Sequence, residues 1–217
     1  MKNIIITSLI VLTGVVTASA QWRLDIVGGI SPGANPGSAG LIVNRHLPHE
    51  EFLFNIGKVD PQFFVGIKSQ VQLGAPFFIE SGLMYSRKKS SYDINYTVID
   101  TEHPVPYHIM NETDHQLLLP LNIGVNLGSF DVMSGFRLTQ SISKKSELDK
   151  LSGFTSNGNP TQIGWQASAG YTFLRNRIGL EYQGNFSRVG SGMMVNNQSL
   201  ELLNIPGQIA LMVNHSF

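Results

Sequence analysis

The sequence contains no cysteine, and this absence excludes several kinds of chemistry at once. A chain without cysteine has no disulfide framework, no thiolate zinc site and no cysteine nucleophile. Neither positive nor negative charge is in excess, because 15 Lys and Arg balance 15 Asp and Glu. Nucleic-acid binders usually carry a basic surface, so we expect no nucleic-acid function.

Charged residues of both signs are scarce, at 14% of 217 residues, whereas soluble domains carry about 25%. The chain is nevertheless 42% hydrophobic, which argues against a disordered protein. Beyond residue 20 it also lacks the run of about 18 apolar residues that marks a membrane-spanning helix. A low charge without such a run suggests a chain that crosses a membrane as strands.

The first twenty residues are predicted to be a signal peptide. Lys2 supplies the positive start, an apolar stretch follows from Ile4 to Val16, and Ala18-Ser19-Ala20 has the small residues that a signal peptidase reads. A short transmembrane anchor is the alternative, but the stretch is shorter than the roughly twenty residues that a spanning helix needs. We therefore expect a signal peptide at 1–20 and a single mature domain at 21–217 of a bacterial envelope protein.

Apolar and polar residues alternate in eight segments of the mature chain, as they do in half-buried strands. Each segment is about ten to thirteen residues long, which suits a tilted strand crossing an apolar band of about 25 Å. The segments lie near residues 22–27, 63–73, 77–85, 117–127, 130–139, 163–173, 178–186 and 205–217.

The connections between these segments alternate in length. Short turns are expected at 74–76, 128–129 and 174–177, and long polar loops at 31–61, 87–114, 141–160 and 188–203. This asymmetry is typical of outer-membrane barrels. The sequence therefore predicts an all-β fold, an eight-stranded antiparallel up-and-down transmembrane β-barrel with short periplasmic turns and long surface loops. A soluble β-sandwich is the alternative architecture.

Charges in the eight segments all fall on the polar face, which we assign to the inside. A lipid-facing Lys or Arg costs about 2–4 kcal/mol at the midplane, so its exclusion from the apolar face fits a lipid-facing surface. A barrel of this size has an interior filled by side chains, where charges need partners. We predict a closed lumen with a charge network of Arg23, Asp25, Lys68, Glu80, Arg137 and Glu181.

The turn at 74–76 also predicts a strand register. It places Leu73 opposite Phe77 and therefore Gln70 opposite Glu80, with Lys68 on the diagonal. Aromatic residues beside the short turns and chain ends are expected to form a girdle at one membrane interface. This predicted girdle consists of Trp22, Phe77, Phe130, Phe173 and Phe217.

The mature chain resembles the PorT-like outer-membrane β-barrel domains. The resemblance rests on the export signal, the eight alternating segments, the stretch Leu117-Leu118-Leu119-Pro120-Leu121 and the carboxyl end with its final aromatic residue. It implies that the barrel-assembly machinery reads the carboxyl end, and it implies a role in protein secretion across the outer membrane. The residues of this assembly signal would be Ile209, Leu211, Val213 and Phe217.

Loop histidines are the only candidate metal ligands. His46, His49, His103 and His108 lie near carboxylates, but their spacing matches no closed zinc motif. We therefore expect neither metal nor cofactor.

A hydrolase would need a serine and a histidine in contact. His215 and Ser216 point to opposite faces of a strand, which leaves His115 with Ser86, Ser90 or Ser91 across a hairpin. We therefore expect no enzymatic activity.

Two loops carry patterns of their own. Tyr92, Ile94, Tyr96 and Val98 alternate with polar residues, which predicts that the third strand continues beyond the membrane after a bulge near 87–89 has shifted its parity. The first loop contains apolar runs at 41–43 and 52–54, which we expect to cover the barrel mouth or to meet lipid headgroups.

The sequence favours a non-enzymatic outer-membrane protein with a structural or interaction role, as a component of an envelope or protein-secretion assembly. Its expected partners are outer-membrane lipids, the barrel-assembly machinery and envelope or secretion proteins that meet the surface loops. A small channel or transporter and a lipid-active barrel enzyme are the alternative functions. The balanced interior charges argue against the first and the missing nucleophile against the second.

Overall fold

A computed structural model describes residues 21–33, 39–43, 50–98, 108–150, 154–156, 160–186, 193–195, 198–199 and 207–217. The predicted signal peptide lies outside these residues. Apart from a single 3-10 turn, η1 (Glu147–Lys150), every regular element in the described part is a strand. A search of the same residues finds no helix long and apolar enough to cross a membrane.

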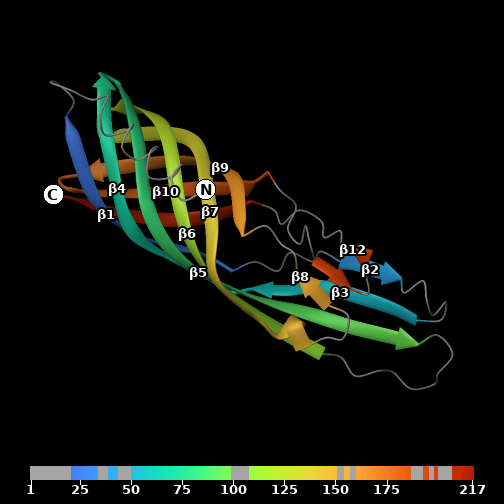
Figure 1. Ribbon diagram of the computed structural model, residues 1–217. Helices are drawn as coiled ribbons and strands as arrows, with labels where there is room; N and C mark the ends of the chain where they lie inside the picture. Colours follow the sequence, from blue (N-terminus) through green and yellow to red (C-terminus); the bar gives the residue numbers. More distant parts are fainter. Residues whose placement is uncertain are drawn as a thin grey trace.

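All eight segments predicted from the sequence contribute strands, and these strands pair in a closed antiparallel ring (Figure 1). The expected all-β, antiparallel fold is thus confirmed. The strands of the ring are β1 (Trp22–Ser31), β4 (Gln62–Gly74), β5 (Phe77–Val98), β6 (His108–Leu127), β7 (Phe130–Ser146), β9 (Thr161–Phe173), β10 (Asn176–Asn185) and β13 (Gln208–Ser216). Each strand pairs with the next in this order, and β13 returns to β1, with Asp25 opposite Ser216.

Residues that alternate in the sequence point alternately into and out of the ring. On β4, the side chains of Phe63 and Ile67 are 61% and 51% exposed, whereas those of Phe64 and Lys68 are 3% and 1% exposed. The other strands of the ring alternate in the same way. The ring therefore turns apolar side chains outward and encloses a largely polar interior, the reverse of the usual arrangement in a soluble domain.

The register of the β4–β5 hairpin follows the prediction except at the turn. Gln70 lies opposite Glu80, as expected. Leu73 does not lie opposite Phe77, because a shift in the pairing makes Leu73 an extra residue and places Gly74 opposite Phe77 instead. Gly74 has a φ of 147°, which a residue without a Cβ adopts at little cost, and this freedom lets the chain close the turn one residue later.

Three strands of the ring continue well beyond it, where β3 (Glu50–Val59) pairs with the far part of β5 and β2 (Ala39–Val43) pairs with β3 (Figure 1). A separate small sheet contains β8 (Phe154–Ser156), β11 (Met193–Val195) and β12 (Gln198–Ser199). Each of the predicted long loops 31–61, 87–114, 141–160 and 188–203 thus contains strands in its described part. The strands extend further than predicted because β5, β6 and β7 pair with one another beyond the apolar segments, which satisfies their backbone groups there.

The bulge expected near 87–89 is absent. β5 pairs with β6 without a shift from Phe77 to Ile94, and the inward parity continues through Ser90 and Tyr92, which are 6% and 3% exposed. The apolar residues change face because β5 leaves the apolar band of the ring, so its inner side becomes the place to bury Tyr92. Shifts of one residue in the pairing occur in the neighbouring strands instead, where Gly57 of β3 and Ile142 of β7 are the extra, unpaired residues.

Candidate functional site

The six charged residues predicted for the lumen all lie on inward positions of the ring. Five of these side chains are 5% exposed or less, and Arg23 is half-buried. Asp131 and Arg177, which were not predicted for the lumen, are also buried inside the ring, at 6% and 3% exposure. The interior then carries four positive charges (Arg23, Lys68, Arg137 and Arg177) and four negative charges (Asp25, Glu80, Asp131 and Glu181), a net charge of zero.

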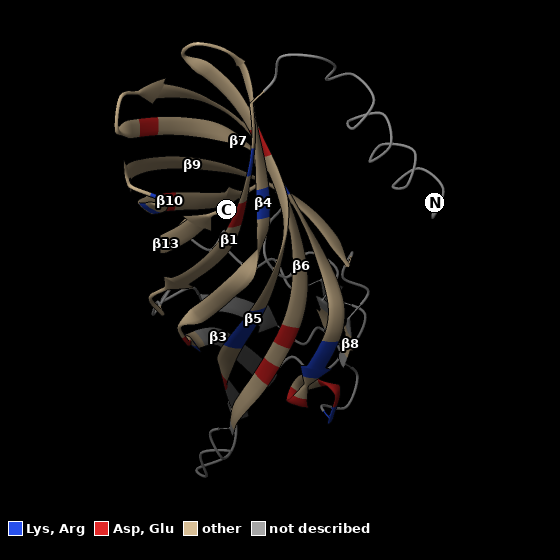
Figure 2. Ribbon diagram, turned by 90° about the vertical axis from the view of Figure 1, so that its left-hand side faces the viewer, with Lys and Arg blue, Asp and Glu red and all other residues tan. Residues whose placement is uncertain are grey.

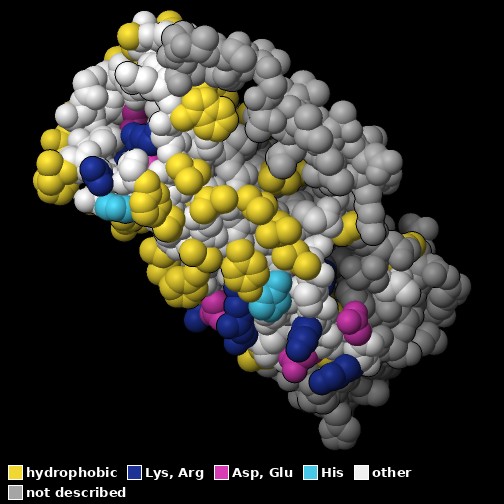
Figure 3. Space-filling model, turned by 60° about the vertical axis from the view of Figure 1, so that its left-hand side comes forward, with side chains coloured by type: hydrophobic (Ala, Val, Ile, Leu, Met, Phe, Trp, Pro, Cys, Tyr) yellow, Lys and Arg dark blue, Asp and Glu magenta, His cyan; other side chains and the backbone are white. Residues whose placement is uncertain are grey.

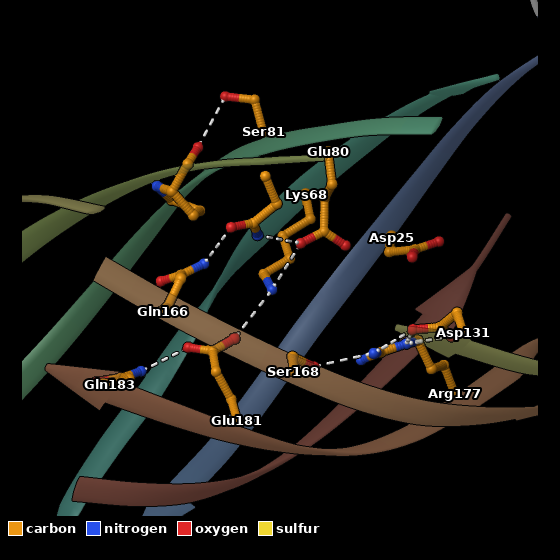
Figure 4. Close-up of polar contacts among 12 residues, drawn as sticks. Asp25, Lys68, Glu80, Ser81, Asp131, Gln166, Ser168, Arg177, Glu181 and Gln183 are labelled. Carbon is orange, nitrogen blue, oxygen red and sulfur yellow. Dashed lines mark hydrogen bonds and ion pairs between the residues drawn. The ribbon is translucent and has the colours of Figure 1, made fainter. Parts of the chain in front are cut away.

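Lys68 lies at the centre of this network, between two carboxylates (Figure 4). Its Nζ atom is 3.0 Å from Oε1 of Glu80 and 3.6 Å from Oε2 of Glu181. Glu80 comes from the adjacent strand β5, but Glu181 comes from β10, which is separated from β4 by β1 and β13 in the ring. The contact therefore crosses the interior and ties opposite walls together.

Side-chain amides hold both carboxylates in place. Asn122 donates to Oε1 of Glu80 at 3.1 Å, and Gln166 donates to Oδ1 of Asn122 at 2.9 Å. On the other wall, Gln183 donates to Oε1 of Glu181 at 2.6 Å. Buried charges are tolerated when such hydrogen bonds add to the ion pair, so the amides and Lys68 form one connected unit.

Two arginines form ion pairs nearer the short turns. Arg177 on β10 donates from Nε to Oδ2 of Asp131 on β7 at 2.7 Å, and from Nη2 to the Ser168 hydroxyl at 3.0 Å. The guanidinium reaches β7 by lying over Gly170 of β9, where any Cβ would collide with it. Arg23 pairs with Asp25 two residues along β1, at 2.8 Å.

The Arg177–Asp131 pair was missed for two reasons. Asp131 was already on the polar face of its segment but was left out of the count of interior charges. Arg177 was assigned to a turn, although the structure begins β10 at Asn176. The parity that Arg177 shares with Glu181 was the available signal, since residues four apart on a strand point to the same side.

The predicted girdle residues are all exposed and lie at the end of the ring that carries the short turns. Their exposed fractions run from 51% for Phe77 to 71% for Phe217. The rings of Phe130 and Tyr171 are in contact, with centroids 4.9 Å apart. On β13 the predicted assembly residues Ile209, Leu211 and Val213 also point outward. In Figure 3 apolar side chains form a band around the visible face, with charged side chains at its margins.

The histidines contribute no described catalytic or metal cluster. His46, His49 and His103 lie outside the described residues, as does the side chain of His108. Nδ1 of His115 lies 2.5 Å from the hydroxyl of Tyr85, whereas Ser86 and Ser90 point into the ring and Ser91 lies opposite Asn111. No group of three or more potential metal ligands occurs in the part of the chain that the structure describes.

Comparison with known proteins gives no relative: no family model matches the chain, and no curated protein matches it.

Replacing Lys68 by methionine tests the central network. Lys68→Met keeps the length of the side chain but leaves Glu80 and Glu181 buried with no cation between them, so the free energy of unfolding should fall by about 3–5 kcal/mol. Lys58→Met removes an exposed ion pair with Asp60 and should change it by less than about 1 kcal/mol. Urea unfolding of both variants in detergent measures the difference, and similar midpoints would contradict the assigned role of Lys68.

Proposed function

We propose that this protein is an integral β-barrel of the bacterial outer membrane, with a closed lumen and a non-enzymatic, structural or interaction role. One observation carries the proposal. Large apolar side chains are exposed on every strand of the ring, among them Leu24, Ile67, Leu83, Ile123 and Leu211. In the described strands, the outward positions from the short turns up to Tyr85, Leu117 and Leu138 include no Asp, Glu, Lys or Arg. A lipid-facing surface requires this pattern.

The height of the apolar surface agrees with a bilayer. On β4 the outward apolar positions run from Phe63 to Leu73, which is ten residue steps. At about 3.3 Å per step and a tilt near 40°, they span about 25 Å along the membrane normal, the usual height of the apolar band of such barrels.

Two of the three outward serines in the apolar band also support an apolar surrounding, whereas the hydroxyl of the third, Ser69, has no hydrogen-bond partner among the described residues. The hydroxyl of Ser81 donates to the carbonyl oxygen of Pro120 at 3.0 Å, and that of Ser134 donates to the carbonyl oxygen of Gln166 at 3.1 Å. Both hydroxyls therefore bond to the neighbouring strand instead of needing water. Polar groups in a bilayer have to be satisfied within the protein.

The interior favours a closed lumen over the alternative of a channel. Lys68 meets Glu80 on the adjacent strand and Glu181 across the ring. Gln183 donates to Glu181, and Asn122, which accepts from Gln166, donates to Glu80. Opening a water-filled path would break ion pairs and hydrogen bonds that are almost fully buried. In this proposal the short turns face the periplasm, and the extension of β5, β6 and β7 faces outward.

The extension offers a surface for an interaction role. Figure 2 shows Lys, Asp and Glu along β5, β6 and the end of β7, where these strands pass beyond the ring. Within the described sheet, β2 is an edge strand that pairs on one side only, with β3. An edge strand can accept a strand from another protein. Together with the PorT-like resemblance, this edge supports membership of an envelope or protein-secretion assembly.

A charge placed on the outer face separates a membrane barrel from the soluble alternative. Ile67 lies at the middle of the outward positions of β4, so Ile67→Lys should make the free energy of folding into phospholipid vesicles less favourable by about 2–4 kcal/mol. Leu174→Lys, in a turn where Leu174 is 83% exposed, should change it by less than about 1 kcal/mol. Urea titration of vesicle-bound protein gives both values. A soluble protein would tolerate Ile67→Lys as well as it tolerates Leu174→Lys.

Electrical recording tests the closed lumen. Because Lys68 and its carboxylates cross the interior, the protein inserted in planar bilayers should show no steady conductance above that of the bare membrane. Heat-modifiable mobility on gels confirms in the same preparation that the protein is folded. Steady open currents from folded protein would contradict the closed lumen and favour the channel.

Purification of the tagged protein from its native membrane tests the interaction role. We expect envelope proteins to co-purify in fixed proportion in mild detergent. A variant lacking 39–43, which removes β2, should lose them while the ring stays folded. Purification of the intact protein alone, at the same yield, would contradict membership of an assembly and leave a purely structural role.

A further inference from the structure

A polar cavity lies in the mouth of the ring, on the side of the extension. Its volume is about 50 Å³, which is room for a few water molecules or one small ion but too little for a sugar or a peptide. Its walls include the amides of Gln62, Gln116, Gln183 and Gln208 and the two cations Arg137 and Lys88. Gln183 also donates to Glu181, so the cavity lies directly beside the closed network.

Arg137 is buried there with most of its hydrogen-bonding capacity unused. The side chain is 5% exposed, and Nη2 donates to Oδ1 of Asn185 at 3.1 Å. Nε and Nη1 have no hydrogen-bond partner among the described residues, and no described carboxylate forms an ion pair with Arg137. A buried guanidinium with unused N–H groups is costly unless something fills the space beside it.

Lys88 supplies the second cation of the cavity. It lies above the apolar band, beyond Tyr85, and it makes no ion pair with any described residue. Burial lowers the pKa of the Lys88 ammonium from its ordinary value, and the carboxylates of Glu112 and Asp114 offset this effect only in part. In the described part of the chain, the ammonium thus has no carboxylate in direct contact.

The carboxylates nearest to the two cations are engaged elsewhere. Glu112 pairs with Lys144 at 2.9 Å, Asp114 accepts from Gln116 at 2.6 Å, and Glu181 pairs with Lys68. The amides add donors, because the side-chain nitrogens of Gln62 and Gln183 each make one hydrogen bond and keep a second N–H. Donors and positive charge thus converge on a space that contains no carboxylate of its own.

We propose that this cavity binds a small oxyanion, a phosphate or carboxylate group, between Arg137 and Lys88. Arginine and lysine are the usual partners of these groups, and burial strengthens such charge-assisted hydrogen bonds. The amides of the wall complete the set of donors. The proposal does not depend on the location of the ring in a membrane, because it uses only the interior of the ring.

Isothermal titration of the refolded full mature chain in detergent tests the site, with inorganic phosphate and acetate as probes in separate runs in a buffer free of other oxyanions. The wild-type protein should bind at least one probe at a single site. Arg137→Gln and Lys88→Gln should each weaken binding at least about tenfold, because each removes a charge-assisted contact. Arg175→Gln removes the same charge from an exposed turn and should leave binding unchanged.

The outcomes separate the possibilities cleanly. Binding of phosphate alone would identify a phosphate site, and binding of acetate would identify a carboxylate site. If Arg137→Gln fails to regain heat-modifiable mobility, Lys88→Gln, at the edge of the cavity, decides the question. No binding of either probe at millimolar concentration would mean a water-filled cavity and would overturn the proposal. Binding that both variants retain in full would do the same, because the ion would then sit elsewhere.

Discussion

A buried ammonium between two carboxylates is the contact on which the rest of the ring depends. Lys68 meets Glu80 on the adjacent strand and Glu181 on the opposite wall, so three strands have to be in the correct register at once. A slip of one residue in β4 would turn Lys68 to the apolar outside and bring Ile67 to the carboxylates. The period of the sequence and the pairing of the interior charges therefore select the same register, and neither one alone would be as specific.

Buried charges are paired differently at the two ends of the interior. Near the short turns, each arginine has its own aspartate within the ring, as in Arg177 with Asp131 and Arg23 with Asp25. Near the mouth, Arg137 and Lys88 line a cavity while the surrounding carboxylates bond to other groups. Without Lys88, the charges inside the ring sum to zero, yet those near the mouth are less fully paired than those near the short turns. That difference sets the mouth apart from the end with the short turns.

Much of the ring could be predicted from the sequence, because period two is a local property that each strand carries by itself. It gave the eight segments, the inward face and the pairing of Gln70 with Glu80. The alternation could not predict the ion pair of Arg177 with Asp131. That contact crosses an intervening strand and requires a glycine at position 170, where a Cβ would collide with the guanidinium. The alternation around Tyr92 did predict that β5 continues beyond the apolar band, as it does to Val98. The continuation of β6 beyond the band was not predicted, and it follows only from the pairing of β6 with β5 and β7.

Closure of the ring joins the two ends of the described chain, since β1 pairs with β13 along its length. Among the described strands this pairing has the largest sequence separation, and contacts of high sequence separation slow folding. Until the last strand arrives, both β1 and β13 present an unpaired backbone edge to any other strand nearby. Folding intermediates that lack this last pairing are therefore expected to be prone to aggregation, however stable the closed ring becomes.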